Sequence, residues 1–277
     1  LSRGLGDVYK RQEVAWTQPE HKDWTAFLKG LDAYNEHLTA KGIVYARSMY
    51  NIQHTVTPNN GVLEVKLECI RPDMEIHYTT DGSEPTATSP LYEKIVPVKE
   101  ALTLKGATFA HGRQMGKTLI LPARWNLATA KPVLGTNPAE KLLTNGIRGS
   151  LKYSDFEWCS WADNDSVSFT IDLLKPEMLN TLILGCITNN GMAIHKPASV
   201  RVEVSDDNSK FREAVVQSFT SEEIFREGNF IENLSLKLGG TQARYVRVTA
   251  KGPGVCPASH VRPGQTSRIF FDEVMLE

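Results

Sequence analysis

Two pairs of adjacent acidic residues are the first groups in this sequence that could do chemistry, because paired carboxylates can act as general acid and base. Asp272-Glu273 lies in a stretch that predicts a strand, so we expect its two side chains on opposite faces of a sheet. Glu222-Glu223 follows Thr220 in a polar stretch that predicts a solvated turn or the start of a short helix. The sequence also lacks G-x-S-x-G and H-E-x-x-H motifs. We therefore expect no catalytic residue in this chain.

A second set of reactive side chains surrounds a predicted turn. His77, Asp81 and Glu84 could hold a metal or exchange protons, but they lie in and beside the turn at residues 80–83. Because Asp-Gly favours tight turns, we expect a structural role for all three.

The cysteines show no metal or redox spacing. Cys69, Cys159, Cys186 and Cys256 lie far apart without a C-x-x-C motif, which argues against a zinc ribbon or a redox motif. Four buried thiols are the favoured interpretation, and two disulfides are the alternative.

Composition excludes several classes of protein. The chain has 277 residues, of which 41% are hydrophobic and 23% charged, as in ordinary globular domains rather than disordered chains. Its formal net charge of −1 offers no electrostatic footprint for nucleic acid or an anionic membrane. No apolar run is long enough to span a bilayer, so we expect no membrane insertion.

One long helix is predicted, over residues 17–41. Thr17 to Glu20 resembles a capping box, and Gly42 is placed for a left-handed C-cap. Apolar residues at steps of three and four, among them Trp24, Phe27 and Leu31, form a stripe that must be buried against a partner. We expect this helix to dock only partly in this chain and to leave apolar surface exposed.

The rest of the chain is predicted to be β. Over residues 49–126, strands at 62–67, 75–79 and 102–109 with turns between them indicate a small antiparallel sandwich. A Pro- and Gly-containing linker is expected at 127–140. Over residues 141–277, many short strands, at 167–173, 181–185, 199–204, 234–238, 244–248 and 269–276, favour a jelly-roll sandwich.

The first half of the chain resembles parts of a known enzyme family. EVAWT followed by KDWTAFLKGLDAYNEHLTAKGIVY is similar to the end of the catalytic barrel of family-20 glycoside hydrolases, the β-N-acetylhexosaminidases. IHYTTDGSEPTATSPLYEKIVPV and LTLKGATFAHGRQMGKT resemble the C-terminal module of bacterial chitobiases and hexosaminidases. The resemblance implies that residues 13–48 are an incomplete remnant of a TIM barrel and that 49–126 form an Ig-like module. Residues 1–12 resemble the translation of a sequencing adapter, so we expect the true N-terminus and the catalytic Asp-Glu pair to be missing.

The second half resembles the factor 5/8 type C, or discoidin-like, domain. The landmarks are LTNGIRGS, W-x-x-W before VSFTIDL, PASVRVEVSDDNSKF, ARYVRVTA and FFDEVMLE. The resemblance implies a galactose-binding-like jelly-roll β-sandwich over 141–277. In such domains a structural calcium ion often joins the opening loop to the last strand, and Asn145 and Glu273 match its ligand positions. The alternative is an Asx turn at Asn145 and a hydrogen-bonded Glu273.

Loops at one end of this predicted sandwich carry residue types that bind sugars, namely rings for the C–H faces and donors for the hydroxyls. The candidate carbohydrate-binding residues are Tyr153, Trp158, Asn190, His195, His260 and Arg262. Trp158 and Trp161 also resemble core landmarks of the family, so a core position is their alternative.

Together the resemblances imply the non-catalytic C-terminal part of a β-N-acetylhexosaminidase, which removes terminal N-acetylhexosamine from glycans by substrate-assisted retaining hydrolysis. The expected partners are glycans with terminal N-acetylhexosamine or galactose-type sugars, with no required cofactor and a periplasmic, cell-surface or secreted location. The alternatives are a stand-alone glycan-binding or adhesion protein, in which the helix would lack a partner, and the tail of another exoglycosidase.

Overall fold

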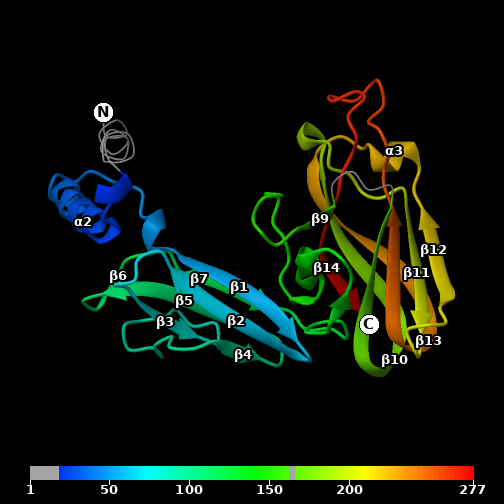
Figure 1. The fold of residues 1–277 in the computed structure, drawn as a ribbon, viewed down its shortest axis with the longest axis horizontal. Helices are drawn as coiled ribbons and strands as arrows, with labels where there is room; N and C mark the ends of the chain where they lie inside the picture. Colours follow the sequence, from blue (N-terminus) through cyan, green and yellow to red (C-terminus); the bar gives the residue numbers. More distant parts are fainter. Residues whose placement is uncertain (1–18, 162–165) are drawn as a thin grey trace.

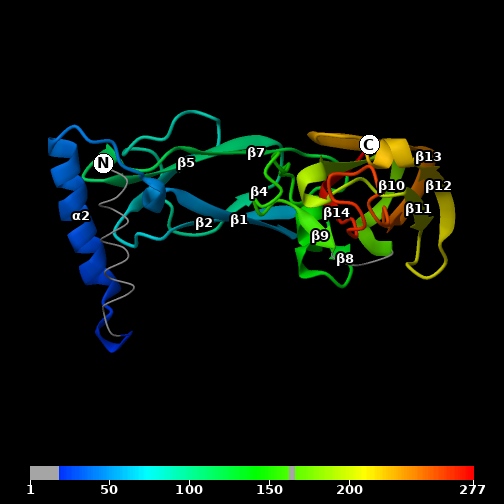
Figure 2. The same ribbon diagram turned by 90° about the horizontal axis from the view of Figure 1, so that it is seen from above.

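The computed structural model describes residues 19–161 and 166–277. It is mainly β: one helix is followed by two antiparallel sandwiches, with the helix and the larger sandwich at opposite ends of the smaller one (Figure 1, Figure 2). The expectations for residues 1–12 and for Thr17 lie outside the described residues. Among the described residues, no helix combines the length and the apolar character needed to cross a membrane.

The helix α2, Trp24–Ala40, begins later than predicted. Residues Pro19–His21 form a separate 3-10 turn, η1, and the Asp23 side chain caps α2 by accepting from the Ala26 N–H at 3.0 Å. Over the described residues the predicted helix is thus interrupted at residues 22–23, because Asp23 is a strong N-cap directly before the first periodic residue. The C-terminus matches the prediction: Gly42 has a φ of +67° and its N–H donates to the Thr39 carbonyl at 3.0 Å.

Polar groups dock α2 on the smaller sandwich. Arg71 donates to both Asp32 oxygens at 2.6 Å and to Asp73, and the Tyr50 hydroxyl donates to Asp32 at 3.0 Å. Trp24 stays 51% exposed, which agrees with the expectation of partial docking with exposed apolar surface.

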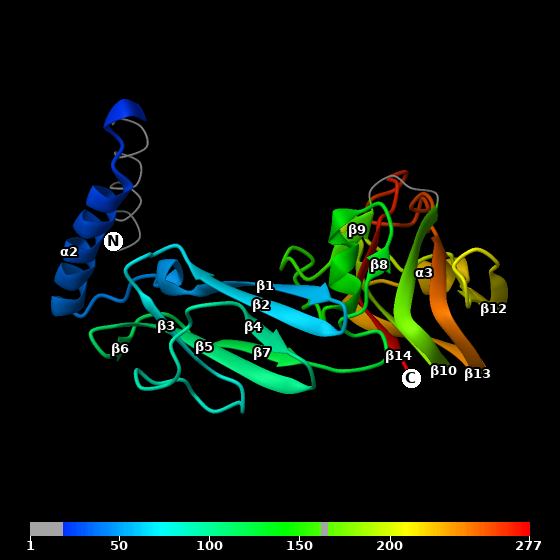
Figure 3. The same ribbon diagram turned by 60° about the horizontal axis from the view of Figure 1, so that its bottom comes forward.

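The smaller sandwich packs a three-stranded sheet on a four-stranded one (Figure 3). The first sheet has the order β1-β2-β4, and the second joins β3, β5, β6 and β7. The strands are β1 Ile52–Asn59, β2 Val62–Cys69, β3 Glu75–Thr79, β4 Val96–Val98, β5 Leu102–Ala110, β6 Arg113–Gln114 and β7 Leu119–Ala123. Two-residue turns with positive φ, Asn60-Gly61 and His111-Gly112, set the registers of β1 with β2 and of β5 with β6.

The turn residues of this sandwich have the structural roles expected of them. Asp81 accepts from the Ser83 N–H and hydroxyl, Glu84 pairs with Lys105, and a ring nitrogen of His77 lies 2.6 Å from the Ser89 carbonyl.

The larger sandwich is built on two long bent strands, β10 Ser166–Asn189 and β13 Asn229–Lys251. Their pairing register shifts between Asp172 and Glu177 and again after Leu179, so each strand serves both layers. One layer continues to β11, Ser199–Ser205, and β12, Arg212–Ser218, and the other to β14, Ile269–Leu276, and β9, Cys159–Trp161. The short helix α3, Ser221–Ile224, confirms the short-helix alternative predicted for Glu222-Glu223, and it also carries a capping box at Thr220 and Glu223.

The expected linker at 127–140 belongs to the larger sandwich. Its Val133–Leu134 form the strand β8, which pairs with Ile171 and Thr170 of β10, and Ala128 is fully buried in the core. Of the residues that suggested a linker, Gly135 lies in a bend and Pro138 begins the 3-10 helix η3, Pro138–Thr144. Ala130 is buried in the core of the smaller sandwich, so this segment joins the two cores.

A β-bulge lies at Asp272-Glu273. Phe271 pairs with Cys186 and Val274 pairs with Leu184, so two residues of β14 oppose the single residue Gly185 of β10. The expectation of opposite faces was wrong, because the extra residue breaks the alternation. Both carboxylates reach the loop at residues 145–149.

Candidate functional site

The residues expected to hold calcium lie in one buried cluster, which we call the carboxylate cluster (Asn145, Arg148, Asp272 and Glu273). Arg148 Nε donates to Asp272 at 2.6 Å, and the Gly149 N–H donates to the same oxygen at 3.0 Å. Glu273 accepts from the Gly146 N–H at 3.1 Å. The opening loop is therefore joined to the last strand by a guanidinium and two backbone donors.

Asn145 forms the Asx turn that was the alternative to a metal ligand. Its side-chain oxygen accepts from the Ile147 N–H at 2.9 Å, and its amide nitrogen donates to Glu157 at 3.0 Å. Glu273 Oε1 is buried and has no hydrogen-bond partner among the described residues. Burial, and then the neighbouring Asp272 charge, raises the pKa of Glu273 well above its usual range. One acceptor of this cluster is thus left for a cation or a proton.

Four of the six candidate sugar-binding residues, Trp158, Asn190, His195 and His260, are buried, so they present little surface to a ligand. Trp158 packs with Ile187, Ile194 and Phe270, and its Nε1 donates to the Ser150 carbonyl at 3.0 Å. The core alternative was therefore right for Trp158 and also for Trp161.

The other three buried candidates engage protein groups. The Asn190 amide lies against the carbonyls of Arg226 and Gly228, at 3.0 and 3.2 Å. His195 and His260 face each other, with Nε2 atoms 3.2 Å apart. Their polar atoms are used internally because the loops that carry them fold inward onto the sandwich.

Tyr153 and Arg262 remain accessible, and they stay predictions as sugar contacts. Tyr153 is half-buried with its edge on Phe270, and Arg262 is exposed beside Gln265. Sequence reasoning missed Phe156, which is 89% exposed at a φ of +72° between Asp155 and Glu157. An aromatic residue within a polar stretch next to Tyr153 was the available signal.

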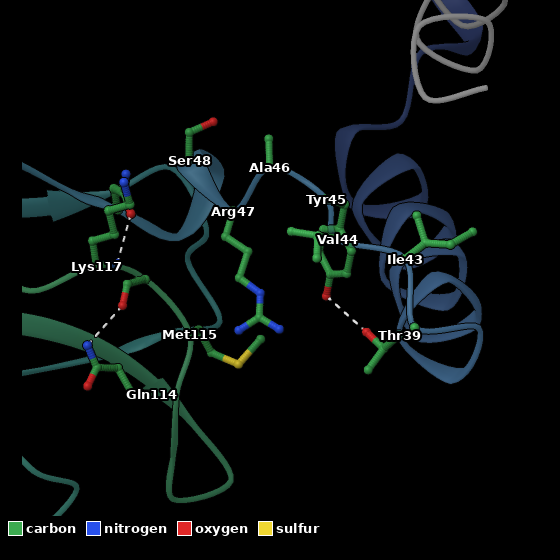
Figure 4. A pocket seen from close by; sticks show the side chains of 13 residues that line it. Thr39, Ile43, Val44, Tyr45, Ala46, Arg47, Ser48, Gln114, Met115 and Lys117 are labelled. Atoms are coloured by element: carbon green, nitrogen blue, oxygen red, sulfur yellow. Dashed lines mark hydrogen bonds between the residues drawn. The ribbon is translucent and has the colours of Figure 1, made fainter. Parts of the chain in front are cut away.

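Two of the open pockets border strands of the smaller sandwich. One, of about 250 Å³, lies between the sandwiches, where His54 Nε2 contacts Glu157 at 3.0 Å beside Arg124 and Arg148. The other, of about 820 Å³, lies between the end of α2 and the segment 114–117, and Figure 4 shows Arg47 reaching into it past Tyr45. Asp155 and Glu157 both line the smaller pocket, and their carboxylates are engaged by protein groups: Asp155 accepts from the Ser150 and Glu157 N–H groups, and Glu157 contacts His54 and Asn145.

All four cysteines are free thiols, as favoured over two disulfides; Cys69 is half-buried and the other three are buried.

Solved structures show similarity at low identity. CpGH89CBM32-6 from Clostridium perfringens is 18% identical, with a TM-score of 0.37, and 55% of this chain covers 98% of it. The fucose-binding module SpX-3 of Streptococcus pneumoniae is 18% identical, with a TM-score of 0.35, 55% of this chain and 97% of that one being covered. The C-terminal domain of a Bacteroides fragilis chitobiase is 16% identical, with a TM-score of 0.29 and coverage of 47% and 76%.

No curated protein matches the chain. Two family models match it in succession. Residues 58–119 match the chitobiase/beta-hexosaminidase C-terminal domain, and residues 128–261 match the F5/8 type C domain. The smaller sandwich is thus similar to the first domain and the larger sandwich to the second.

Proposed function

We propose that this chain is the non-catalytic C-terminal part of a β-N-acetylhexosaminidase and that it binds glycans for the catalytic domain. The observation that carries the proposal is the order of the two matched regions, a chitobiase/beta-hexosaminidase C-terminal domain followed directly by an F5/8 type C domain. The docked helix α2 supports it, since ion pairs to Arg71 fasten that helix to the first of these regions. The whole enzyme removes terminal N-acetylhexosamine by substrate-assisted retaining hydrolysis and acts outside the cytoplasm.

The glycan contact is assigned to the loop around Phe156. An exposed ring offers a face for the C–H side of a sugar, and Arg124 lines the neighbouring pocket with hydrogen-bond donors. The expected ligands are terminal N-acetylhexosamine or galactose-type sugars.

Calorimetric titration of the chain with N-acetylglucosamine, N-acetylgalactosamine and galactose tests the proposed binding. Phe156→Ala should weaken binding by about 2- to 10-fold, because a ring contact is worth about 0.5–1.5 kcal/mol. Val261→Ala, which removes another exposed apolar side chain, is the matched control. Absence of binding to all three sugars, or equal loss in both variants, would contradict the proposal.

The second part of the proposal is the lack of hydrolysis. The purified chain should not cleave aryl N-acetylglucosaminides, because Asp272 and Glu273 are buried against the opening loop. Turnover that disappears when a residue of this chain is mutated would overturn this part.

We also propose that a structural calcium ion can bind at the carboxylate cluster. Glu273 Oε1, buried without a partner, is the atom that supports it, and Asn145 and Glu157 supply further oxygen atoms nearby. Calcium should raise the thermal midpoint of the chain and leave that of Glu273→Gln unchanged. An equal response of both proteins would refute the site.

A further inference from the structure

A second cluster of metal-ligating side chains lies apart from the carboxylate cluster. His195 follows the 3-10 helix η4, Asn190–Met192, whereas Cys256 and His260 belong to the loop 252–268 between β13 and β14. Their ligand atoms all lie within 4.8 Å of one another, and all three side chains are buried. Within residues 19–161 and 166–277, this is the group of three such side chains that one ion could bridge.

The backbone already holds the two segments side by side. The His195 N–H donates to the Arg268 carbonyl at 3.1 Å, and the Arg268 N–H donates to the Ala193 carbonyl at 2.9 Å. Inside the loop, Val255 forms a bridge with Thr266. The three ligand-bearing side chains are therefore positioned before any ion binds, which lowers the ordering cost of binding.

The two histidines have the separation of two ligands on one tetrahedral ion. Zinc binds imidazole nitrogen at about 2.0–2.1 Å, so two such nitrogens lie about 3.3 Å apart. The His195 and His260 Nε2 atoms are 3.2 Å apart. Ser267 Oγ lies 2.6 Å from His195 Nδ1 and donates to the Ala193 carbonyl, so it accepts from His195 Nδ1–H. This leaves the His195 Nε2 lone pair facing the cluster.

Without an ion, one hydrogen bond occupies the same space. The Arg262 N–H donates to His260 Nδ1 at 3.0 Å, so His260 carries its proton on Nε2 and donates it to His195. An ion would replace that proton, and His260 Nδ1 would become the protonated nitrogen. The Arg262 contact would then open, at a point where the loop is exposed.

Burial acts on the protonation of two of the three side chains in opposite directions. Burial, and then the nearby His260, lowers the pKa of His195 to about 4. Burial raises the pKa of the Cys256 thiol, so an ion that binds there must displace the thiol proton. The Phe225 ring, 5.0 Å from the His195 ring, closes one side of the cluster with an apolar surface.

We propose that His195, Cys256 and His260 together bind one divalent transition-metal ion, zinc by ligand type, which fastens the loop 252–268 to the segment after β10. One thiolate and two imidazoles form a soft donor set that suits zinc and disfavours calcium and magnesium. Three protein ligands leave a fourth position for water. The inference is independent of the proposed function.

Titration of the chelator-treated full chain with zinc, and with cobalt as a spectroscopic probe, tests the proposal. We expect one equivalent of each, with a thiolate-to-cobalt charge-transfer band and release of protons on binding. Cys256→Ala should remove that band and weaken zinc binding at least about tenfold. His195→Gln should also weaken zinc binding at least about tenfold. Cys69→Ala, which removes a free thiol in the smaller sandwich, should leave both unchanged.

A measurement on the unmutated chain guards against variants that do not fold. Zinc should slow the alkylation of Cys256 at least about tenfold and leave the alkylation of Cys69 unchanged. Peptide mass spectrometry measures both rates. No stoichiometric zinc binding, a cobalt spectrum without the thiolate band, or equal protection of both thiols would overturn the proposal.

Discussion

The ion pairs of Arg71 and of Arg148 are buried in opposite ways in the two sandwiches. In the smaller one the cation is buried: the Arg71 side chain is 3% exposed, whereas Asp32 and Asp73 are 36% and 53% exposed. In the larger one the anion is buried: Asp272 is fully buried and Arg148 is the more exposed partner. Removing either arginine therefore has a different consequence, because only the loss of Arg148 leaves a carboxylate, that of Asp272, buried without its cation.

The largest effect is therefore expected for Arg148→Leu. It should lower the free energy of unfolding by about 3–5 kcal/mol, the range for breaking a buried pair. Urea unfolding measures this loss, and adding Asp272→Asn should restore part of it because the buried charge is then gone. A loss below about 1 kcal/mol would mean that Asp272 is not charged in the folded chain.

Gly185→Ala tests the bulge that brings both carboxylates to the opening loop. A Cβ at Gly185 would overlap the Asp272 carboxylate and approach Arg148 Nη2 to 2.5 Å. Overpacking of this kind costs about 1–3 kcal/mol. The matched control is Gly191→Ala, where the nearest atom is 3.5 Å away. Equal thermal midpoints for the two variants would show that the bulge can relax.

Arg71→Leu should cost only about 1 kcal/mol or less, because its two carboxylate partners remain in contact with water. The expected change is a loosening of α2, detected as greater exposure of Trp24 to a soluble quencher. A cost as large as that of Arg148→Leu would erase the contrast between the two sandwiches.

The smallest effect concerns acid. The Arg71 guanidinium lowers the pKa of Asp73 below its ordinary value of 3.8. The Asp73–Arg71 pair therefore contributes its full stability above pH 3.8, and this contribution is lost as the pH falls through the lowered pKa of Asp73. The difference in unfolding midpoint between the wild type and Asp73→Asn should shrink below about pH 3.8. A difference that stays constant down to pH 2 would contradict the pairing.

Local patterns predicted much of the fold. The strands at 62–67, 75–79 and 102–109 all exist, because alternation and turn residues act over a few positions. The bulge also had a signal: Ile269 and Phe271 lie in one core with Val274 and Leu276, a change of phase that strict alternation does not allow. Gly185 inside a strand was a second signal.

The candidate site was predicted less well. Tyr153 and Arg262 remain accessible, whereas Trp158, Asn190, His195 and His260 are buried. Residue type identified groups able to bind a sugar, but the same groups satisfy the interior when a loop folds inward. Phe156 was missed because its exposure depends on the packing of its neighbours rather than on its own type.

The sequence by itself determined which two domain families the chain resembles. It also determined the hairpin turns, the strand alternation and the capping of short elements, because these depend on neighbours a few residues apart. Only the tertiary structure decided which side chains meet. His195 and His260 are 65 residues apart in the chain, and Arg148 and Asp272 are 124 apart. Their contacts arise because β10, β13 and β14 bring distant loops to one end of a sandwich, and burial there sets which groups remain free to bind.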